Sequence, residues 1–172
     1  MFIKAQVQHP LTSFSLSKAT PPVTYSLSNG DNNITLVSNN NTGVVLSTAG
    51  LRFEAPSGDN FYVNYRGRSG SQAASITTKG RAALGQKFKW GGAPIEANHN
   101  TMSATLGIMA SEDDTNITIS GYNPNCEFRL QNDLDGLTAN TINITLQKGQ
   151  SYVLEAAKDA ASANVDGWIA LQ

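Results

Sequence analysis

The chain has 172 residues, of which 40% are hydrophobic and 15% are charged, with a net charge of -1 and a single cysteine. An average soluble domain carries about 25% charged residues, and Asn, Thr, Ser and Gly take their place here. The near-zero net charge argues against nucleic acid as a partner. No apolar run approaches the roughly 20 residues that cross a bilayer, so we expect no membrane insertion. Cys126 has no second cysteine to pair with, which excludes an intrachain disulfide.

Short runs in which apolar and polar residues alternate fill the first half of the chain, as in half-buried β-strands. They cover residues 2–8, 13–17, 23–27, 34–37, 43–47, 51–54, 61–65, 74–78 and 87–90. Asn29-Gly30 is a strong hairpin signal, and we expect Asp31-Asn32-Asn33 to lengthen this turn before the strand at 34–37.

The second half continues in the same way. Strand-like runs cover residues 101–110, 116–120, 126–130, 141–146, 151–155 and 168–171. Residues 156–164 have a helix-like composition, and we interpret them as a loop with at most one helical turn. The sequence predicts an all-β fold, an antiparallel β-sandwich of jelly-roll or adhesin-like type. It leaves open whether residues 1–172 form one sandwich or two packed sub-sandwiches with a loose division near 59/60.

The charges are unevenly distributed along the chain. Residues 60–95 contain six basic residues and no acid, whereas residues 96–172 contain ten acids and three basic residues. The first interpretation is that the two halves pack together with complementary charges. The second is that the basic stretch binds an anionic glycan or another surface. The candidate ligand-binding residues of the second interpretation are Arg66, Arg68, Lys79 and Arg81.

Trp90 precedes Gly91-Gly92, an arrangement in which an exposed indole can stack on a sugar ring. A tryptophan in the core is the more common case. Trp90 is therefore a candidate for carbohydrate binding, with a core position as the alternative.

Two acidic segments are candidates for calcium, which prefers oxygen ligands. One contains Asp113 and Asp114, and the other contains Asp133 and Asp135 in the order Asp-Leu-Asp-Gly. Adjacent acids on an extended chain point in alternating directions, and the second segment lacks the later bidentate Glu of an EF-hand. Turns are the competing interpretation for both segments. The calcium site is thus an option, and we expect no other cofactor.

No catalytic motif occurs in the chain. The sequence has no G-x-S-x-G, P-loop, H-E-x-x-H or C-x-x-C pattern. Cys126 stands in a strand-like run, where it is expected to act as a small buried hydrophobe. We therefore expect a protein that is not an enzyme.

Three blocks of sequence, in a fixed order, carry a recognisable pattern. They are Tyr62–Gly91, in which Gln72 to Gly85 and Phe88-Lys89-Trp90-Gly91 stand out, then Leu106–Ile119, then Ile144–Glu155. The second fits A-S/T-E-D-x-T-x-I-T-I and the third fits L-x-x-G-Q-S-Y-x-L-E. Over residues 60–172 the chain resembles the module of large Bacteroidetes cell-surface proteins with gliding-motility-type C-terminal sorting domains. This module is similar to the N-terminal region of IgGFc-binding protein.

The resemblance implies an extracellular, β-rich, adhesin-like protein with no catalytic residues to carry over. The chain starts and stops within strand-like runs, so we expect a piece of a longer exported protein, secreted or held on the bacterial outer surface. Its expected role is structural or adhesive, with carbohydrate binding, assisted by calcium, as the alternative. The expected partners are neighbouring β modules of the same polypeptide and a surface glycan or protein.

Overall fold

The structure, a computed structural model, describes residues 2–7, 12–16, 23–27, 30–35, 41–47, 61–69, 72–77, 79–91, 95, 103–166 and 170–171. These segments form β-strands and two short 3-10 helices, η1 (Gly80–Ala83) and η2 (Ser162–Val165). Neither helical turn among the described residues is long and apolar enough to span a membrane. The chain divides into two compact units: unit 1 comprises Met1–Asn39 and Leu51–Leu84, and unit 2 comprises Asn40–Gly50 and Gly85–Gln172. That the whole chain acts as one sandwich stays a prediction.

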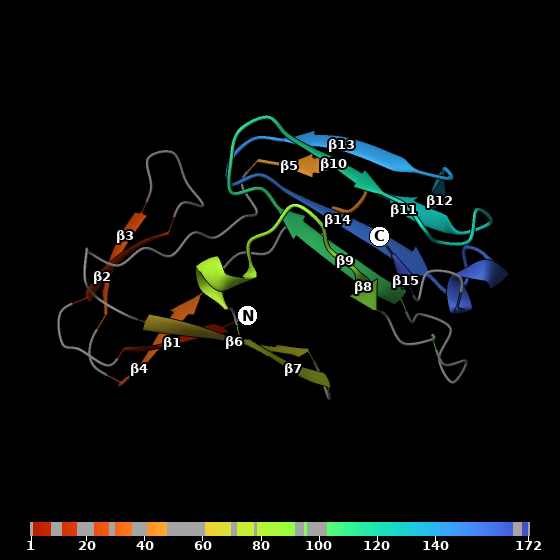
Figure 1. Ribbon diagram of the computed structural model, residues 1–172. Coiled ribbons are helices and arrows are strands. Elements are labelled where there is room, and N and C mark those ends of the chain that lie inside the picture. Colours follow the sequence, from red (N-terminus) through yellow and green to blue (C-terminus); the bar gives the residue numbers. More distant parts are fainter. Residues whose placement is uncertain are drawn as a thin grey trace. The chain divides into compact units, whose positions relative to one another are not determined.

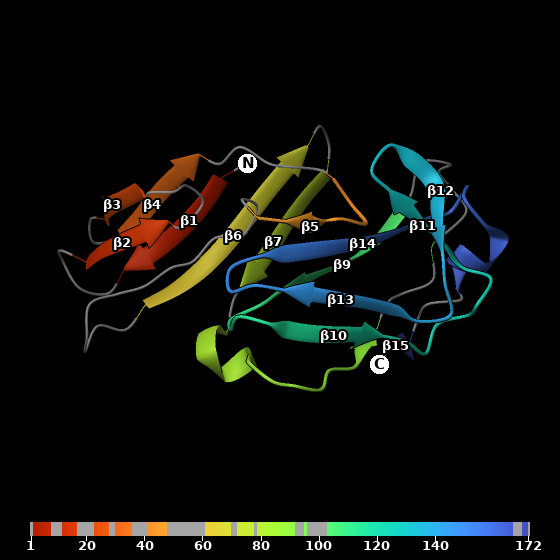
Figure 2. The same cartoon turned by 90° about the horizontal axis from the view of Figure 1, so that it is seen from above.

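Unit 1 contains a four-stranded antiparallel sheet and a separate hairpin. The sheet has the order β4-β1-β6-β7, shown side by side in Figure 2. Its strands are β1 (Phe2–Val7), β4 (Gly30–Thr35), β6 (Phe61–Ser69) and β7 (Gln72–Thr77). The hairpin pairs β2 (Thr12–Leu16) with β3 (Val23–Leu27).

The register of the sheet in unit 1 explains why the alternating runs fold into it. Ile34, Ile3, Tyr65 and Ile76 occupy one row across the four strands. The neighbouring row contains the positions of Thr35, Phe2, Arg66 and Ser75. Because successive residues of a strand point to opposite faces, the first row places apolar positions on one face and the second places mainly polar positions on the other.

The turn predicted around Asn29-Gly30 is wrong in its extent. Strand β4 begins at Gly30 and includes Asp31, Asn32 and Asn33, and it pairs with β1 instead of β3. The ladder with β1 satisfies the backbone of this polar segment, and such cross-strand pairing outweighs the local turn preference of Asp and Asn. The strand predicted at 51–54 lies outside the described residues.

Unit 2 is built from short antiparallel strands (Figure 1). One sheet has the order β5-β14-β9, and β10 pairs with β13 in a second. Two further pairs are β11 with β12 and β8 with β15. The bounds are β5 (Val45–Leu46), β8 (Trp90–Gly91), β9 (Ser103–Met109), β10 (Thr115–Ile119), β11 (Glu127–Leu130), β12 (Asp133–Thr138), β13 (Ile142–Leu146), β14 (Ser151–Ala157) and β15 (Ala170–Leu171).

The core of unit 2 lies between these sheets, and in Figure 1 β10 and β13 are drawn above β14 and β9. Every second residue of β14 is buried, and those of β10 and β13 alternate in the same way. The buried cluster consists of Ala110, Ile119, Tyr122, Cys126, Phe128, Ile142, Leu146, Tyr152, Leu154 and Ala156. Because both sheets contribute to one apolar interior, the predicted all-β, antiparallel, sandwich-like fold is confirmed.

Two local predictions in unit 2 are wrong. Residues 133–136, expected to form a turn, belong to β12, whose pairing with β11 contains an irregularity between Phe128 and Leu130. Calcium binding by Asp133 and Asp135 stays a prediction. Such a bulge accommodates extra residues within a strand pair, so a turn-like composition does not end the pairing. The strand expected at 87–90 is shorter, since β8 contains only Trp90 and Gly91.

Candidate functional site

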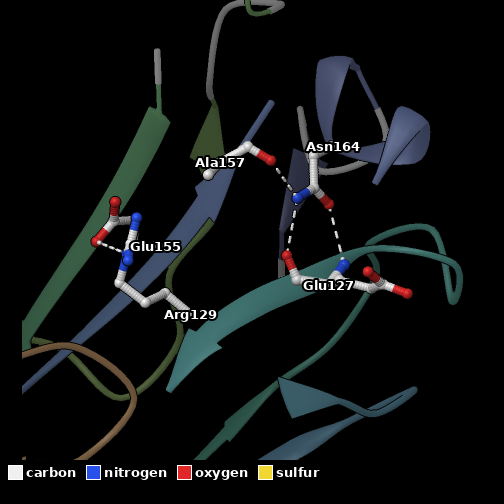
Figure 3. Close-up of polar contacts among 5 residues, drawn as sticks. All are labelled: Glu127, Arg129, Glu155, Ala157 and Asn164. Atoms are coloured by element: carbon white, nitrogen blue, oxygen red, sulfur yellow. Dashed lines mark hydrogen bonds and ion pairs between the residues drawn. The ribbon is translucent and has the colours of Figure 1, made fainter. Parts of the chain in front are cut away.

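The buried side chain of Asn164 joins β11 to the end of β14 (Figure 3). Its Oδ1 accepts a hydrogen bond from Glu127 N at 3.0 Å, and its Nδ2 donates to Glu127 O at 2.8 Å and Ala157 O at 2.7 Å. Asn164 is 0% exposed, and both of its N–H groups have an acceptor. We call this arrangement of Glu127, Ala157 and Asn164 the Asn164 clamp. It supplies hydrogen-bond partners to the backbones of both strands.

The turn that follows β14 positions the clamp. Ala160 N donates to Ala157 O at 3.2 Å, and Asn164 N donates to Ala161 O at 3.0 Å, which closes η2. The thiol of Cys126 lies 3.5 Å from Ala163 O. These contacts fix η2 next to the start of β11, and local sequence does not reveal them because Asn164 and Glu127 are separated by 37 residues.

An ion pair and a close backbone contact also join β11 and β14 to their neighbours, and we call this region the β11–β14 junction. Arg129 Nε lies 3.2 Å from Glu155 Oε2, which links β11 to β14 (Figure 3). Gly43 N donates to Val153 O at 2.9 Å. A Cβ atom at Gly43 would lie 2.5 Å from Arg129 O, and the φ of this residue is +74°. The position therefore requires glycine, both for its conformation and for the space.

Burial keeps the titratable groups of this interior protonated. Burial raises the pKa of Tyr122, with smaller contributions from Cys126 and Tyr152, and burial also raises the pKa of Tyr152. Burial raises the pKa of the Cys126 thiol above its ordinary value, against a lowering hydrogen bond from Asn123. A thiol held in its neutral form is a poor nucleophile. The burial of Cys126 agrees with the hydrophobic role expected from the sequence.

The residues predicted to bind a ligand belong to different elements, and their joint site stays a prediction. Trp90 is half-buried and packs against the core of unit 2. Lys79 and Arg81 are exposed at η1. Arg66 and Arg68 are two residues apart in β6, so their positions share a face of the sheet in unit 1, opposite Ser75 and Ala73. Carbohydrate stacking on Trp90 stays a prediction, and the packing of the indole against the core does not favour it.

The residues predicted to bind calcium lie in two different places. Asp113 Oδ1 accepts a hydrogen bond from Lys148 N at 3.0 Å, and Asp114 Oδ1 accepts one from Gln147 Nε2 at 2.9 Å. These bonds join the β9–β10 turn to the β13–β14 turn. Asp133 and Asp135 are exposed in β12. In the part of the chain that the structure describes, no group of three or more His, Cys, Asp or Glu side chains is suited to a metal ion.

The outer face of the β10–β13 sheet carries a polar ladder. Thr118 Oγ1 donates to Asn143 Oδ1 at 2.9 Å, and Thr145 Oγ1 donates to Asn116 Oδ1 at 2.8 Å. Each strand contains Asn-Ile-Thr, and the antiparallel register sets each Asn opposite a Thr. All four side chains are exposed and uncharged. The alternation predicts that these residues point outward, whereas the pairing of the strands decides which of them meet.

Residues 79–89 comprise η1 and the exposed stretch that leads from it to β8, and we call them the basic segment. It contains Lys79, Arg81, Lys87 and Lys89 and no acid. Every residue in it is exposed, and Leu84 and Phe88 are each 60% exposed. Charge along the sequence draws attention to this region, but the exposure of its two large apolar side chains is visible only in the structure.

A comparison with known families identifies the module. The family model described as IgGFc binding protein matches residues 73–167, more than half of the chain. The chain belongs to this family. The match covers the basic segment, strands β8 to β14 of unit 2 and the Asn164 clamp, and it confirms the resemblance to an IgGFc-binding module. The family comprises non-enzymatic binding modules that are typically extracellular. No curated protein and no solved structure matches the chain.

Proposed function

We propose that this IgGFc-binding-family chain is a non-catalytic module of a bacterial cell-surface protein, in which it has a structural or adhesive role by contacting other proteins. The observation that carries the proposal is the family match over residues 73–167, which includes most of unit 2. The parent protein is an exported polypeptide with neighbouring β modules.

The interior of unit 2 supports a scaffold role. Its buried side chains are mostly apolar and form one cluster. The buried amide of Asn164 has partners for its oxygen and for both N–H groups. A module with this interior meets its partners on its surface, where exposed polar ladders and the basic segment are available.

Export and partner class are tested separately. We expect an antibody raised against the chain to label intact cells that carry the parent protein, without permeabilisation. Labelling that requires permeabilisation would contradict the cell-surface assignment.

For the partner class, the immobilised chain is exposed to the Fc region of immunoglobulin G, the protein named in the family's description. A glycan array, with and without EDTA, is measured in parallel. We expect binding to protein and none to millimolar sugars. Binding confined to glycans, and abolished by EDTA, would instead support the calcium-assisted carbohydrate module.

A further inference from the structure

We propose that the basic segment, residues 79–89, docks on exposed acidic residues of unit 2 in a second copy of this chain. The inference rests on the proposed protein-contacting function, and it names the contact surface and the partner. It applies to modules brought together at high local density, as on a cell surface.

The basic segment combines charge with exposed apolar area. Its four cations lie within eleven residues of sequence, and none of them takes part in an ion pair with another described residue. Leu84 and Phe88 are more exposed than any other large hydrophobic residue described. Exposed apolar side chains framed by charges mark interaction sites more often than isolated surface residues do.

Phe88 is held in place on one side. A Cβ atom at Gly85 would lie 3.2 Å from the Cζ atom of Phe88, so the ring lies over the backbone of Gly85. Lys87 and Lys89 flank the ring in sequence and are exposed. The segment therefore presents an aromatic side chain between two cations, and a negatively charged protein surface complements the two cations.

Unit 2 itself carries exposed acids in three places, at the β9–β10 turn, in β12 and on either side of η2. Its described acids are mostly exposed, while Glu155 is engaged by Arg129. The exposed acids are Glu112, Asp113, Asp114, Asp133, Asp135, Asp159 and Asp166. Only Lys148 and Lys158 offset them among residues 130–166. Charge complementarity thus makes a second copy a suitable partner, through a contact of two different surfaces.

The physics of exposed charges sets the strength of this contact. An exposed ion pair contributes little by itself, and salt screens it. Several pairs, together with burial of Phe88 and Leu84, give weak association that depends on salt. Because the two contacting surfaces differ, the contact can repeat from copy to copy and produce masses beyond a dimer.

The test is sedimentation equilibrium of the full chain at about 20 mM and about 0.5 M salt, which differ several-fold in screening length. We expect a mass that rises with protein concentration at low salt and a monomer at high salt. A monomer at both salt concentrations would overturn the proposal, since it places the segment against the same chain or leaves it without a protein contact. A mass that does not respond to salt would also overturn it.

Two charge variants locate the contact. Lys87→Gln/Lys89→Gln should weaken association about tenfold or more. Lys148→Gln/Lys158→Gln removes the same number of charges but makes unit 2 more negative, so it should leave association unchanged or strengthen it. Equal weakening by both variants would show an effect of net charge alone and would overturn the proposal. Phe88→Ser, which changes no charge, should weaken association as well.

A heparin column and vesicles of anionic lipid test whether the basic segment binds an anionic glycan or a lipid surface instead. Retention that depends on Lys87 and Lys89, together with a monomeric mass at low salt, would assign the segment to an anionic glycan or a lipid surface and would overturn the second-copy contact. This failure leaves the proposed function standing, because surface labelling and Fc binding are measured independently.

Discussion

The segment that carries Asn164 and the basic segment both contain a short 3-10 helix next to β-strands, yet they use their polar groups in opposite ways. In the clamp, one amide side chain is fully buried and forms three hydrogen bonds with backbone groups 7 and 37 residues away. In the basic segment, four cations and two large apolar side chains are exposed. The difference teaches that polarity alone does not distinguish a structural residue from a contact residue. Burial and the presence of partners do.

Loss of the clamp should give the largest effect. Asn164→Ala leaves Glu127 N and Glu127 O without their Asn164 partner, whereas Ala157 O keeps its bond from Ala160 N. Each unsatisfied buried backbone group costs about 1–3 kcal/mol. We expect the free energy of unfolding to fall by about 3 kcal/mol. Asn143→Ala is the matched control, since its exposed side chain forms one cross-strand bond and its loss should cost about 1 kcal/mol or less. Denaturant unfolding of both variants measures the difference, and equal losses would show that the clamp is unimportant.

The clamp also marks the limit of prediction from sequence. Alternating residues in β10, β13 and β14 revealed the sandwich, because each strand has one buried face. Asn164 stands in a segment whose composition indicated a loop, and its role depends on a partner 37 residues away. The turn predicted at residues 133–136 was wrong for a similar reason, since pairing with β11 overrode the preference of these residues for a turn. The charge of the basic segment was visible in the sequence, whereas the exposure of Phe88 required the structure.

Gly43 provides a second way to break the β11–β14 junction. Gly43→Ala combines a positive φ with a clash against Arg129 O. Gly149→Ala is the matched control, because Gly149 has a similar φ of +82° and nothing lies within 4 Å of the place that its Cβ atom would take. The left-handed backbone costs a non-glycine residue about 1–2 kcal/mol. Both alanine variants should lose this amount, and Gly43→Ala should lose more. Equal unfolding free energies for the two variants would contradict the close contact at Gly43.

Alkaline pH should weaken the interior without any substitution. The pKa values of Cys126, Tyr122 and Tyr152 are raised by burial above their ordinary values of 9.0 for the thiol and 10.0 for the two phenols. The folded protein therefore keeps these protons more tightly than the unfolded chain, and stability falls as pH rises above these values. Below about pH 9 these three groups should not change the free energy of unfolding as the pH varies. Thermal unfolding between neutral and alkaline pH measures this, and Tyr122→Phe should reduce the decline.

The ion pair at the junction should contribute less than the clamp. Arg129 and Glu155 are 29% and 16% exposed, so solvent partly screens their attraction. Arg129→Ala or Glu155→Gln should lower the unfolding free energy by about 0.2–1 kcal/mol, with a smaller effect at high salt. A double-mutant cycle isolates the coupling between the two side chains. A coupling free energy several times larger would contradict this prediction, because the ion pair would then stabilise the fold as much as the Asn164 clamp does.

The most direct test of the account measures unfolding and association on the same variant, Lys87→Gln/Lys89→Gln. The account assigns stability to the buried junction and contact to the basic segment. It predicts an unfolding free energy within about 0.5 kcal/mol of the unsubstituted chain, as for ordinary surface substitutions, together with loss of salt-dependent association. A variant that loses stability while its association is unchanged would contradict this division of roles.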